Sequence, residues 1–270
     1  MTRRYAEVIG DPIAQSKSPV IHGFWLGALG IDAEYRRCHV TAAQLPDYFA
    51  ARRADPHWLG CNITQPHKIA ALDHVADPGG VRASIGAINT VFRGDDGTLV
   101  GTNTDAAGFW APIAELDLAG QPVAVVGTGG AARAVLFALS RVGTGPVTVI
   151  ARNPLKAAGL LAQFGLKGRS ATLVEPVPTA ALLVNASSLG MAGQPPLDLD
   201  LDALPDDALV YDIVYHPLDT PLLAAARARD LDTVDGLEML VGQAAVAFEL
   251  FFGTEPPRDR DDELRALLLG

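Results

Sequence analysis

The sequence of 270 residues has few of the features that mark secreted, membrane-bound or nucleic-acid-binding proteins. Its two cysteines, Cys38 and Cys61, lack C-x-x-C spacing, so we expect reduced thiols in a cytoplasmic protein. Six histidines without ligand spacing predict no metal site. A formal net charge of −10 disfavours an extended nucleic-acid surface. No 18-residue apolar run predicts a membrane span, and the opening MTRRYAEVIG lacks the apolar stretch of a secretion signal.

Apolar residues make up 49% of the chain and charged residues 19%, which is enough apolar material for one large core or two ordinary ones. The first hundred residues alternate between β-like and helix-like segments, which is typical of an open α/β domain. We expect strands at 5–10, 34–40, 58–64, 90–93 and 98–101, and helices at 18–29, 44–54 and from the QPHK segment to about residue 75.

Three stretches in this part of the sequence contain more polar residues than a turn or a helix cap needs. In SKSP (16–19), Ser18 before Pro19 is expected to cap a helix, but capping does not explain Ser16. In NITQPHK (62–68), Lys68 would lie in a first helical turn, where the helix dipole disfavours a cation, although a solvated surface lysine is an alternative. GTNTD (101–105) precedes a helix expected at 106–116, and Asp105 has the alternative role of N-cap. Ligands of open α/β sheets bind where such segments meet, at the carboxyl edge.

The segment PVAVVGTGGAARAV (122–135) predicts a buried strand, a tight glycine turn and a helix. Glycines at 127, 129 and 130 permit close backbone approach to a ligand, and the helix start favours a pyrophosphate. Ala132 stands at the third position of the G-x-G-x-x-G pattern, where alanine is allowed. Six candidate strands, the count of a dinucleotide-binding Rossmann domain, lie at 123–126, 147–151, 171–174, 182–186, 209–215 and 233–235.

The end of the second strand of this domain lacks the carboxylate that binds the ribose 2′-hydroxyl in NAD-preferring sites. It reads VIARNPLK, with Arg152, Asn153 and Lys156. A guanidinium can form a forked pair with a 2′-phosphate, so we predict NADP over NAD, an ordinary solvated arginine being the alternative.

Two further helices are expected at 236–253 and 258–269, and they do not fit a seventh Rossmann unit. We therefore predict that the chain returns and packs them on the first domain. The domains would be 1–105 with 236–270, and 106–235. Gln243, polar within an apolar helix, needs a partner or a ligand; a satisfied buried glutamine is the alternative.

The motifs together resemble the shikimate dehydrogenase family over essentially the whole chain. Eight stretches in the family's order carry the resemblance: SKSP (16–19), NITQPHK (62–68), GAINT (86–90), GTNTD (101–105), GTGGAARA (127–134), NASSLGM (185–191), DIVYHPLDTPLL (212–223) and GLEMLVGQAAVAFEL (236–250). The resemblance implies a two-lobed α/β enzyme with a substrate domain and a Rossmann NADP(H)-binding domain. It implies the reversible NADPH-dependent reduction of 3-dehydroshikimate to shikimate, a step of aromatic amino acid biosynthesis, by a monomer or homodimer.

The resemblance also implies roles for individual residues. Lys68 and Asp105 would form the catalytic pair. The substrate would be held by Ser16, Ser18, Thr64, Asn89, Asp105, Tyr215 and Gln243. The cofactor would be held by Gly127, Thr128, Gly129, Gly130, Ala131, Arg152, Asn153 and Lys156, with Ile213 and Gly236 near the nicotinamide.

Two departures from the family pattern bear on specificity. The usual N-R-T is Ala151-Arg152-Asn153 here, so one side-chain hydrogen bond to the 2′-phosphate is lost. Ser18 stands where related quinate/shikimate enzymes, which often use NAD, tend to have threonine, and this favours shikimate. The alternatives are an NAD-linked quinate/shikimate dehydrogenase and, in another class, a non-catalytic NADP-binding module. A folate-linked or tRNA-linked reductase is disfavoured because the first domain lacks a basic surface.

Overall fold

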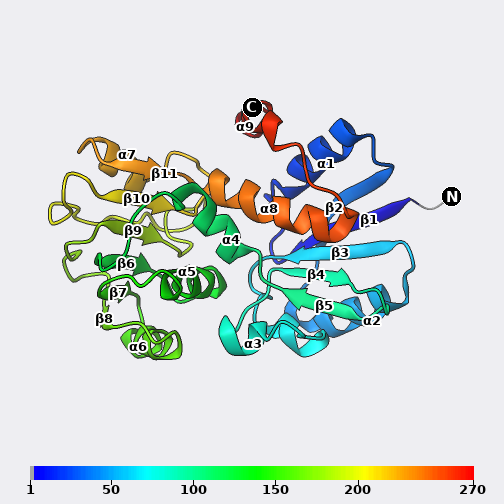
Figure 1. Cartoon of the computed structure of the whole chain (residues 1–270), viewed down its shortest axis with the longest axis horizontal. Coiled ribbons are helices and arrows are strands. Elements are labelled where there is room, and N and C mark those ends of the chain that lie inside the picture. Colours follow the sequence, from blue (N-terminus) through cyan, green and yellow to red (C-terminus); the bar gives the residue numbers. More distant parts are fainter. Residues whose placement is uncertain (1–2) are drawn as a thin grey trace. The chain divides into compact units, whose positions relative to one another are not determined.

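The computed structural model describes residues 3–270; residues 1–2, where the opening segment considered as a secretion signal begins, lie outside the described part. The chain divides into two compact units, Met1–Thr104 with Val241–Gly270, and Asp105–Leu240 (Figure 1). Each unit contains one β-sheet. No helix within residues 3–270 is long and apolar enough to cross a bilayer.

The sheet of the first unit has the strand order β2-β1-β3-β4-β5. Its strands are β1 (Arg4–Gly10), β2 (Ala33–His39), β3 (Trp58–Ile63), β4 (Thr90–Arg93) and β5 (Leu99–Thr102). Strand β1 pairs in parallel with β2 and with β3. Strand β4 pairs antiparallel with β3 on one side and with β5 on the other. Thr90 at the start of β4 is opposite Asn62 on one side and Thr102 on the other. The ends of β1, β3 and β5 and the start of β4 therefore meet at one edge of the sheet.

Helices cover both faces of this sheet (Figure 1). The helical segments around it are α1 (Ser18–Leu29), η1 (Ala42–Gln44), α2 (Leu45–Ala54), η2 (Ala70–His74), α3 (Val81–Ser84), α8 (Gly236–Phe252), η4 (Arg258–Arg260) and α9 (Asp261–Leu269). Gly60 of β3 lies so close to α8 that a Cβ would be 2.4 Å from the Phe251 ring. Lys17, next to α1, donates to the Leu268 carbonyl of α9. The predicted return of the C-terminal helices to the first part of the chain is thus confirmed.

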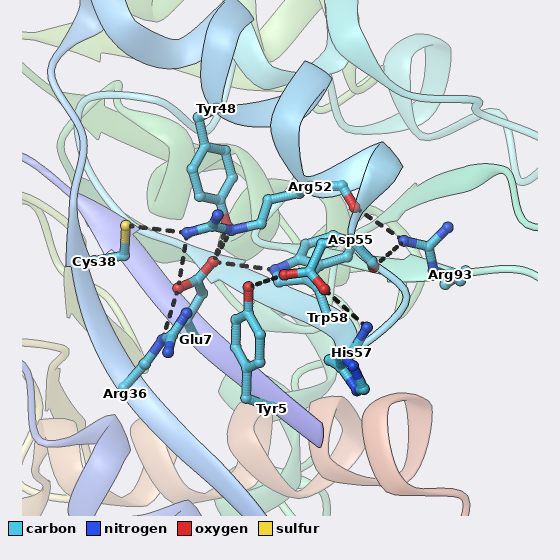
Figure 2. A network of polar contacts seen from close by, with 10 residues as sticks. All are labelled: Tyr5, Glu7, Arg36, Cys38, Tyr48, Arg52, Asp55, His57, Trp58 and Arg93. Carbon is cyan, nitrogen blue, oxygen red and sulfur yellow. Dashed lines mark hydrogen bonds and ion pairs between the residues drawn. The ribbon is translucent and has the colours of Figure 1, made fainter. Parts of the chain in front are cut away.

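The opposite face of the sheet holds a buried charged network centred on Glu7 of β1 (Figure 2). Its carboxylate accepts from Tyr48 Oη at 2.8 Å, Arg52 Nε at 2.5 Å and Trp58 Nε1 at 3.1 Å. Tyr48 and Arg52 belong to α2, so these bonds fasten that helix to β1. Burial alone would lower the pKa of Arg52, but the hydrogen bond and charge of Glu7 raise it.

The sheet of the second unit has six parallel strands in the order β11-β10-β9-β6-β7-β8. These are β6 (Val123–Val126), β7 (Val147–Ile150), β8 (Gly168–Ala171), β9 (Leu182–Asn185), β10 (Leu209–Asp212) and β11 (Asp232–Val234). Numbered from β6, this is the 3-2-1-4-5-6 order of the Rossmann fold. The predicted Rossmann domain is confirmed.

Successive side chains along each strand point to opposite faces of this sheet. They therefore pack into two cores, one on each face. Val123 and Val125 join the core with α4 (Asp105–Trp110), α5 (Gly130–Ser140) and α6 (Pro154–Gln163). Ala124 and Val126 join the other core, with α7 (Pro221–Arg227). The short helix η3 (Ala111–Ile113) follows α4.

The helix predicted from QPHK to about residue 75 is wrong. The chain forms a turn there, followed only by the 3₁₀ segment η2. His67 is buried and its Nε2 donates to the Val40 carbonyl at 2.5 Å, and the Lys68 carbonyl accepts from Ile88 N at 2.8 Å. Because that carbonyl is used across the sheet edge, it is not available to a helical N–H four residues later. Lys68 thus lies in a turn and not in a helix.

Three smaller expectations also differ, and one short helix was not expected. The helix expected at 106–116 is only one and a half turns of α4, since Pro112 lacks the N–H that would continue it. Strand 171–174 lies earlier, at β8, and Thr172 instead starts a turn closed by Glu175. Strand 209–215 ends at Asp212. The short helix α3 was not predicted; the Asp77 carboxylate accepts from the N–H groups of Val81 and Arg82 at its start.

Candidate active site

The two serines of SKSP are buried together in the segment between β1 and α1. Ser16 Oγ donates to Ser18 Oγ at 3.3 Å and accepts from Ser18 N at 3.3 Å. Arg37 Nε donates to the Ser16 carbonyl at 3.0 Å. The expected capping role of Ser18 is wrong, because α1 begins at Ser18 itself and no side chain caps it.

Asn89 and Gln243 meet at the same sheet edge, although they are far apart in the sequence. Asn89 Nδ2 donates to Gln243 Oε1 at 3.2 Å and to Thr104 Oγ1 at 2.9 Å. Asn89 Oδ1 accepts from Thr104 N at 2.7 Å. Asn89 and Gln243 are both almost completely buried. Asn89, which directly precedes β4, and Thr104, which follows β5, are thus partners of Gln243.

Thr64 and Lys68 follow β3 at this edge and are both half-buried. Thr64 N donates to the Ile9 carbonyl at 2.9 Å, which continues the β1–β3 pairing by one residue. Gly10 makes this approach possible, because a Cβ there would lie 2.4 Å from Thr64 Cγ2. Lys68 is tied by its carbonyl to Ile88, the residue before Asn89.

The remaining predicted substrate residues belong to the second unit. Asp105 is buried and is the first residue of α4. Tyr215 is half-buried in the segment that follows β10.

The glycine turn follows β6 as predicted. Gly127 has φ +117°, and a Cβ there would lie 2.7 Å from the Ala186 carbonyl oxygen, so this position requires glycine. Gly129 is different, because a Cβ there would meet no protein atom within 4 Å. Thr128 precedes it, and Gly130 and Ala131 open α5 behind it. The turn thus leaves space beside a helix N-terminus, where anions bind favourably.

The polar residues after β7 are exposed at the start of α6. Arg152, Asn153 and Lys156 are all exposed. Asn153 caps the helix, its Oδ1 accepting from Lys156 N at 3.1 Å. Arg152 thus presents an exposed cation close to the end of β7.

Ile213 and Gly236 are in direct contact. A Cβ on Gly236 would lie 2.4 Å from the Ile213 carbonyl oxygen, so glycine permits the start of α8 to pack on the end of β10. Asp212, the residue before Ile213, accepts from Asn185 Nδ2 at 2.9 Å, Val214 N at 3.0 Å and Thr220 Oγ1 at 2.7 Å. Burial raises the pKa of this carboxyl and the hydrogen bonds oppose the rise.

Sequence reasoning missed the buried residues that hold these groups: Tyr35, Asn62, Thr90, Thr104 and Asp212. Four of them lie within or next to stretches already singled out, 62–68, 86–90, 101–105 and 212–223. A polar residue at a strand position that must be buried was the available signal. No group of three or more His, Cys, Asp or Glu side chains in the described chain is placed to hold a metal ion.

Two family models match the sequence. The shikimate dehydrogenase substrate binding domain matches residues 8–91, and the shikimate 5'-dehydrogenase C-terminal domain matches residues 236–261. A curated relative, the shikimate dehydrogenase (NADP(+)) of Sphingopyxis alaskensis, is 69% identical over 98% of this chain and 97% of its own. The chain belongs to the shikimate dehydrogenase family.

Solved structures of this family share the fold. The shikimate 5-dehydrogenase of Thermus thermophilus, solved with NADP(H) and shikimate, is 36% identical with a TM-score of 0.84, over 98% of this chain and 100% of the other. The quinate dehydrogenase of Corynebacterium glutamicum, solved with NAD, is 31% identical with a TM-score of 0.87, over 98% and 99%.

Proposed function

We propose that this chain catalyses the reversible reduction of 3-dehydroshikimate to shikimate with NADPH. The observation that carries the proposal is the 69% identity, over nearly the whole of both chains, to a shikimate dehydrogenase (NADP(+)). A relative with this identity over nearly its whole length shares the fold that positions the site residues. The motifs and the Rossmann sheet of this chain support the same conclusion.

In this proposal the first unit binds the substrate. The buried hydroxyls of Ser16 and Ser18 hold the substrate carboxylate by neutral hydrogen bonds. Thr64, Asn89 and Gln243 of this unit meet the ring hydroxyls, and Tyr215 and Asp105 of the second unit are further proposed substrate residues. A site built from buried polar groups rejects analogues that leave those groups unpaired, which suits a small polyhydroxylated acid.

The second unit binds NADP(H) in this proposal. The open space beside Gly129 and the start of α5 fits the pyrophosphate, and exposed Arg152 fits the 2′-phosphate. Lys156 adds a second positive charge nearby, and the contact of Gly236 with Ile213 fixes the segments expected beside the nicotinamide. The cofactor supplies hydride when bound.

Lys68 and Asp105 are proposed as the catalytic pair. The ammonium of Lys68 stabilises negative charge at the reacting substrate oxygen and donates a proton there. The carboxylate of Asp105 orients the lysine and accepts from the same substrate hydroxyl. In the reverse direction Lys68 takes that proton back.

The setting of the enzyme is also part of the proposal. We expect it to act in the cytoplasm on a small-molecule substrate, without nucleic acid, as a monomer or homodimer. Cys38 and Cys61 are both free thiols, Cys61 fully buried, which suits a reducing compartment.

The test is initial-rate oxidation of shikimate and of quinate, each with NADP and with NAD, followed at the nicotinamide absorbance. Shikimate with NADP is expected to give the highest kcat/KM. A preference for quinate with NAD would instead make this chain functionally similar to the quinate dehydrogenase, and Ser18 and Asn153 would be the residues to re-examine. NADPH binding without turnover of either substrate would indicate a cofactor-binding module.

A further inference from the structure

A continuous chain of buried hydrogen bonds runs under the first unit's site residues. It begins at Tyr35 of β2, passes through Asn62 of β3 and Thr90 of β4, and reaches Asn89. Tyr35 Oη donates to Asn62 Oδ1 at 2.6 Å. Asn62 Nδ2 donates to Thr90 Oγ1 at 3.0 Å, and Thr90 Oγ1 donates to Asn89 Oδ1 at 3.2 Å. Every residue named is at most 8% exposed.

Two backbone groups fix the direction of every bond in this chain. The Asn89 carbonyl can only accept, so the Asn62 group that faces it at 3.4 Å is the amide nitrogen, and Asn62 Oδ1 faces Tyr35. Thr104 N can only donate, so the Asn89 group that faces it at 2.7 Å is the oxygen. Tyr35 therefore spends its one proton on Asn62.

The chain thus ends at Asn89, which binds the ring hydroxyls of the substrate in the proposed function. Tyr35, Asn62 and Thr90 were not assigned to the substrate. They lie on β2, β3 and β4: β1 lies between β2 and β3 and pairs with both, and Asn62 of β3 is paired with Thr90 of β4.

We propose that Tyr35, with Asn62 and Thr90, is a positioning residue for substrate recognition, which holds Asn89 in one hydrogen-bonded orientation suited to a hydroxylated ring acid. This inference rests on the proposed function. Without the Tyr35 hydroxyl, Asn62 Oδ1 loses its short donor. The hydrogen bonds from Asn62 through Thr90 to Asn89 then no longer have one preferred direction of donation, and substrate binding must restore it.

The test compares Tyr35→Phe with a matched control, Tyr48→Phe. Both changes remove one buried phenol hydroxyl from the first unit, but Tyr48 donates to Glu7 on the opposite face of the sheet. Loss of one buried hydrogen bond predicts that Tyr35→Phe raises KM for shikimate about five- to tenfold. Its kcat and its KM for NADP, and all three constants of Tyr48→Phe, should stay within about twofold of wild type. Equal KM for shikimate in the two variants, with both less stable than wild type, would make Tyr35 merely structural.

A second pair of variants tests the inference even if the Tyr35→Phe variant does not fold. Thr90→Val removes the hydroxyl between Asn62 and Asn89 at nearly constant volume, and Thr90→Ser restores it. KM for shikimate should rise in Thr90→Val and return towards wild type in Thr90→Ser; no rise in Thr90→Val would overturn the inference.

Calorimetric binding of shikimate separates this inference from the proposed function. A wild type that binds shikimate without turning it over would sink the proposed activity, while a weakened Kd in Tyr35→Phe alone would still support the positioning role. Failure of the wild type to bind shikimate at all would overturn both.

Discussion

Arg52 of α2 donates its Nε–H to the fully buried Glu7 of β1 at 2.5 Å, and this ion pair joins helix to sheet (Figure 2). A buried carboxylate is tolerated only when its charge and lone pairs are compensated. Here Arg52 supplies the closest charge, and Tyr48 and Trp58 supply neutral donors.

We therefore predict that Arg52→Met lowers the free energy of unfolding by about 3 kcal/mol, because it leaves Glu7 buried without its main counter-charge. Glu7→Gln should cost less, since its amide oxygen still accepts from Tyr48 and Trp58. The double variant should be about as stable as Glu7→Gln alone. Urea denaturation of the four proteins gives the coupling energy; additive losses would mean that the pair contributes nothing as a pair.

Arg260→Met is the control for this cycle. Arg260, the last residue of η4, pairs with Glu263 of α9 at 2.5 Å, a similar distance between exposed side chains. Exposed pairs are screened by water, so its removal should change stability little.

We predict that alanine substitutions at Gly127 and at Gly129 affect different properties, stability in the first case and NADPH binding in the second. Gly127→Ala should lower stability by about 2 kcal/mol or more, since φ is +117° and the new Cβ would collide with the Ala186 carbonyl. Gly129→Ala should fold normally, because its φ is −83° and its Cβ meets no protein atom, but it should bind NADPH more weakly. Thermal unfolding and NADPH titration measure the two properties separately. Unchanged NADPH affinity in Gly129→Ala would show that the space beside Gly129 is not where the cofactor binds.

The sequence predicted most of this fold because its strands and the glycine turn have strong local patterns. The stretch 123–130, apolar and then rich in glycine, needs no distant partner to be recognised. The turn at His67 and Lys68 could not be predicted in this way. It depends on the Val40 carbonyl and on Ile88 N, which come from other parts of the chain. A helix signal in the local sequence was outweighed by these long-range bonds.

The difference between local sequence patterns and long-range contacts also explains which site residues could be identified from the sequence and which could not. Asn89 and Gln243 were identified through motifs, but their contact joins residues 154 positions apart and is visible only in the folded chain. Tyr35 has no motif around it. It becomes relevant because β2 and β3 flank β1, which brings its hydroxyl to Asn62.

Arg152 should distinguish the two nicotinamide cofactors. Arg152→Ala is expected to raise KM for NADPH by about tenfold or more, the scale of a hydrogen bond to a charged group, and to change KM for NADH little. Arg169→Ala is the control, since Arg169 is an exposed arginine of the neighbouring strand β8. Equal effects of Arg152→Ala on both cofactors would mean that Arg152 does not contact the 2′-phosphate.

His22 should make the folded chain sensitive to acid. Its ring is fully buried and stacks on Tyr35 at 3.9 Å, and neither ring nitrogen has a hydrogen-bond partner among the described residues. Burial lowers the pKa of His22 to about 3, below the ordinary value of 6.5. The unfolded chain therefore binds a proton that the folded chain does not, so the stabilising contribution is complete above pH 6.5 and is lost as pH falls towards 3.

The loss should be about 1.4 kcal/mol per pH unit between these limits. We predict that wild type becomes less stable relative to His22→Phe by about 2 kcal/mol between pH 6.5 and pH 4.5, as measured by urea denaturation at each pH. His216→Gln, which alters an exposed histidine, should follow wild type over this range. A constant difference between wild type and His22→Phe would show that His22 is not held neutral by burial.

Lys68 is the residue on which the proposed chemistry depends most. Lys68→Ala should lower kcat for shikimate oxidation by roughly a hundredfold or more, with a smaller change in KM, because a proton-transfer group acts mainly in the transition state. Lys167→Ala, which changes an exposed lysine of the second unit, should leave both constants unchanged. The Lys68 carbonyl, not its side chain, holds the turn to Ile88, so the alanine variant should fold and bind NADPH like wild type. Near-normal turnover in this well-folded variant would remove Lys68 from the catalytic pair and leave Asp105 as the group to test.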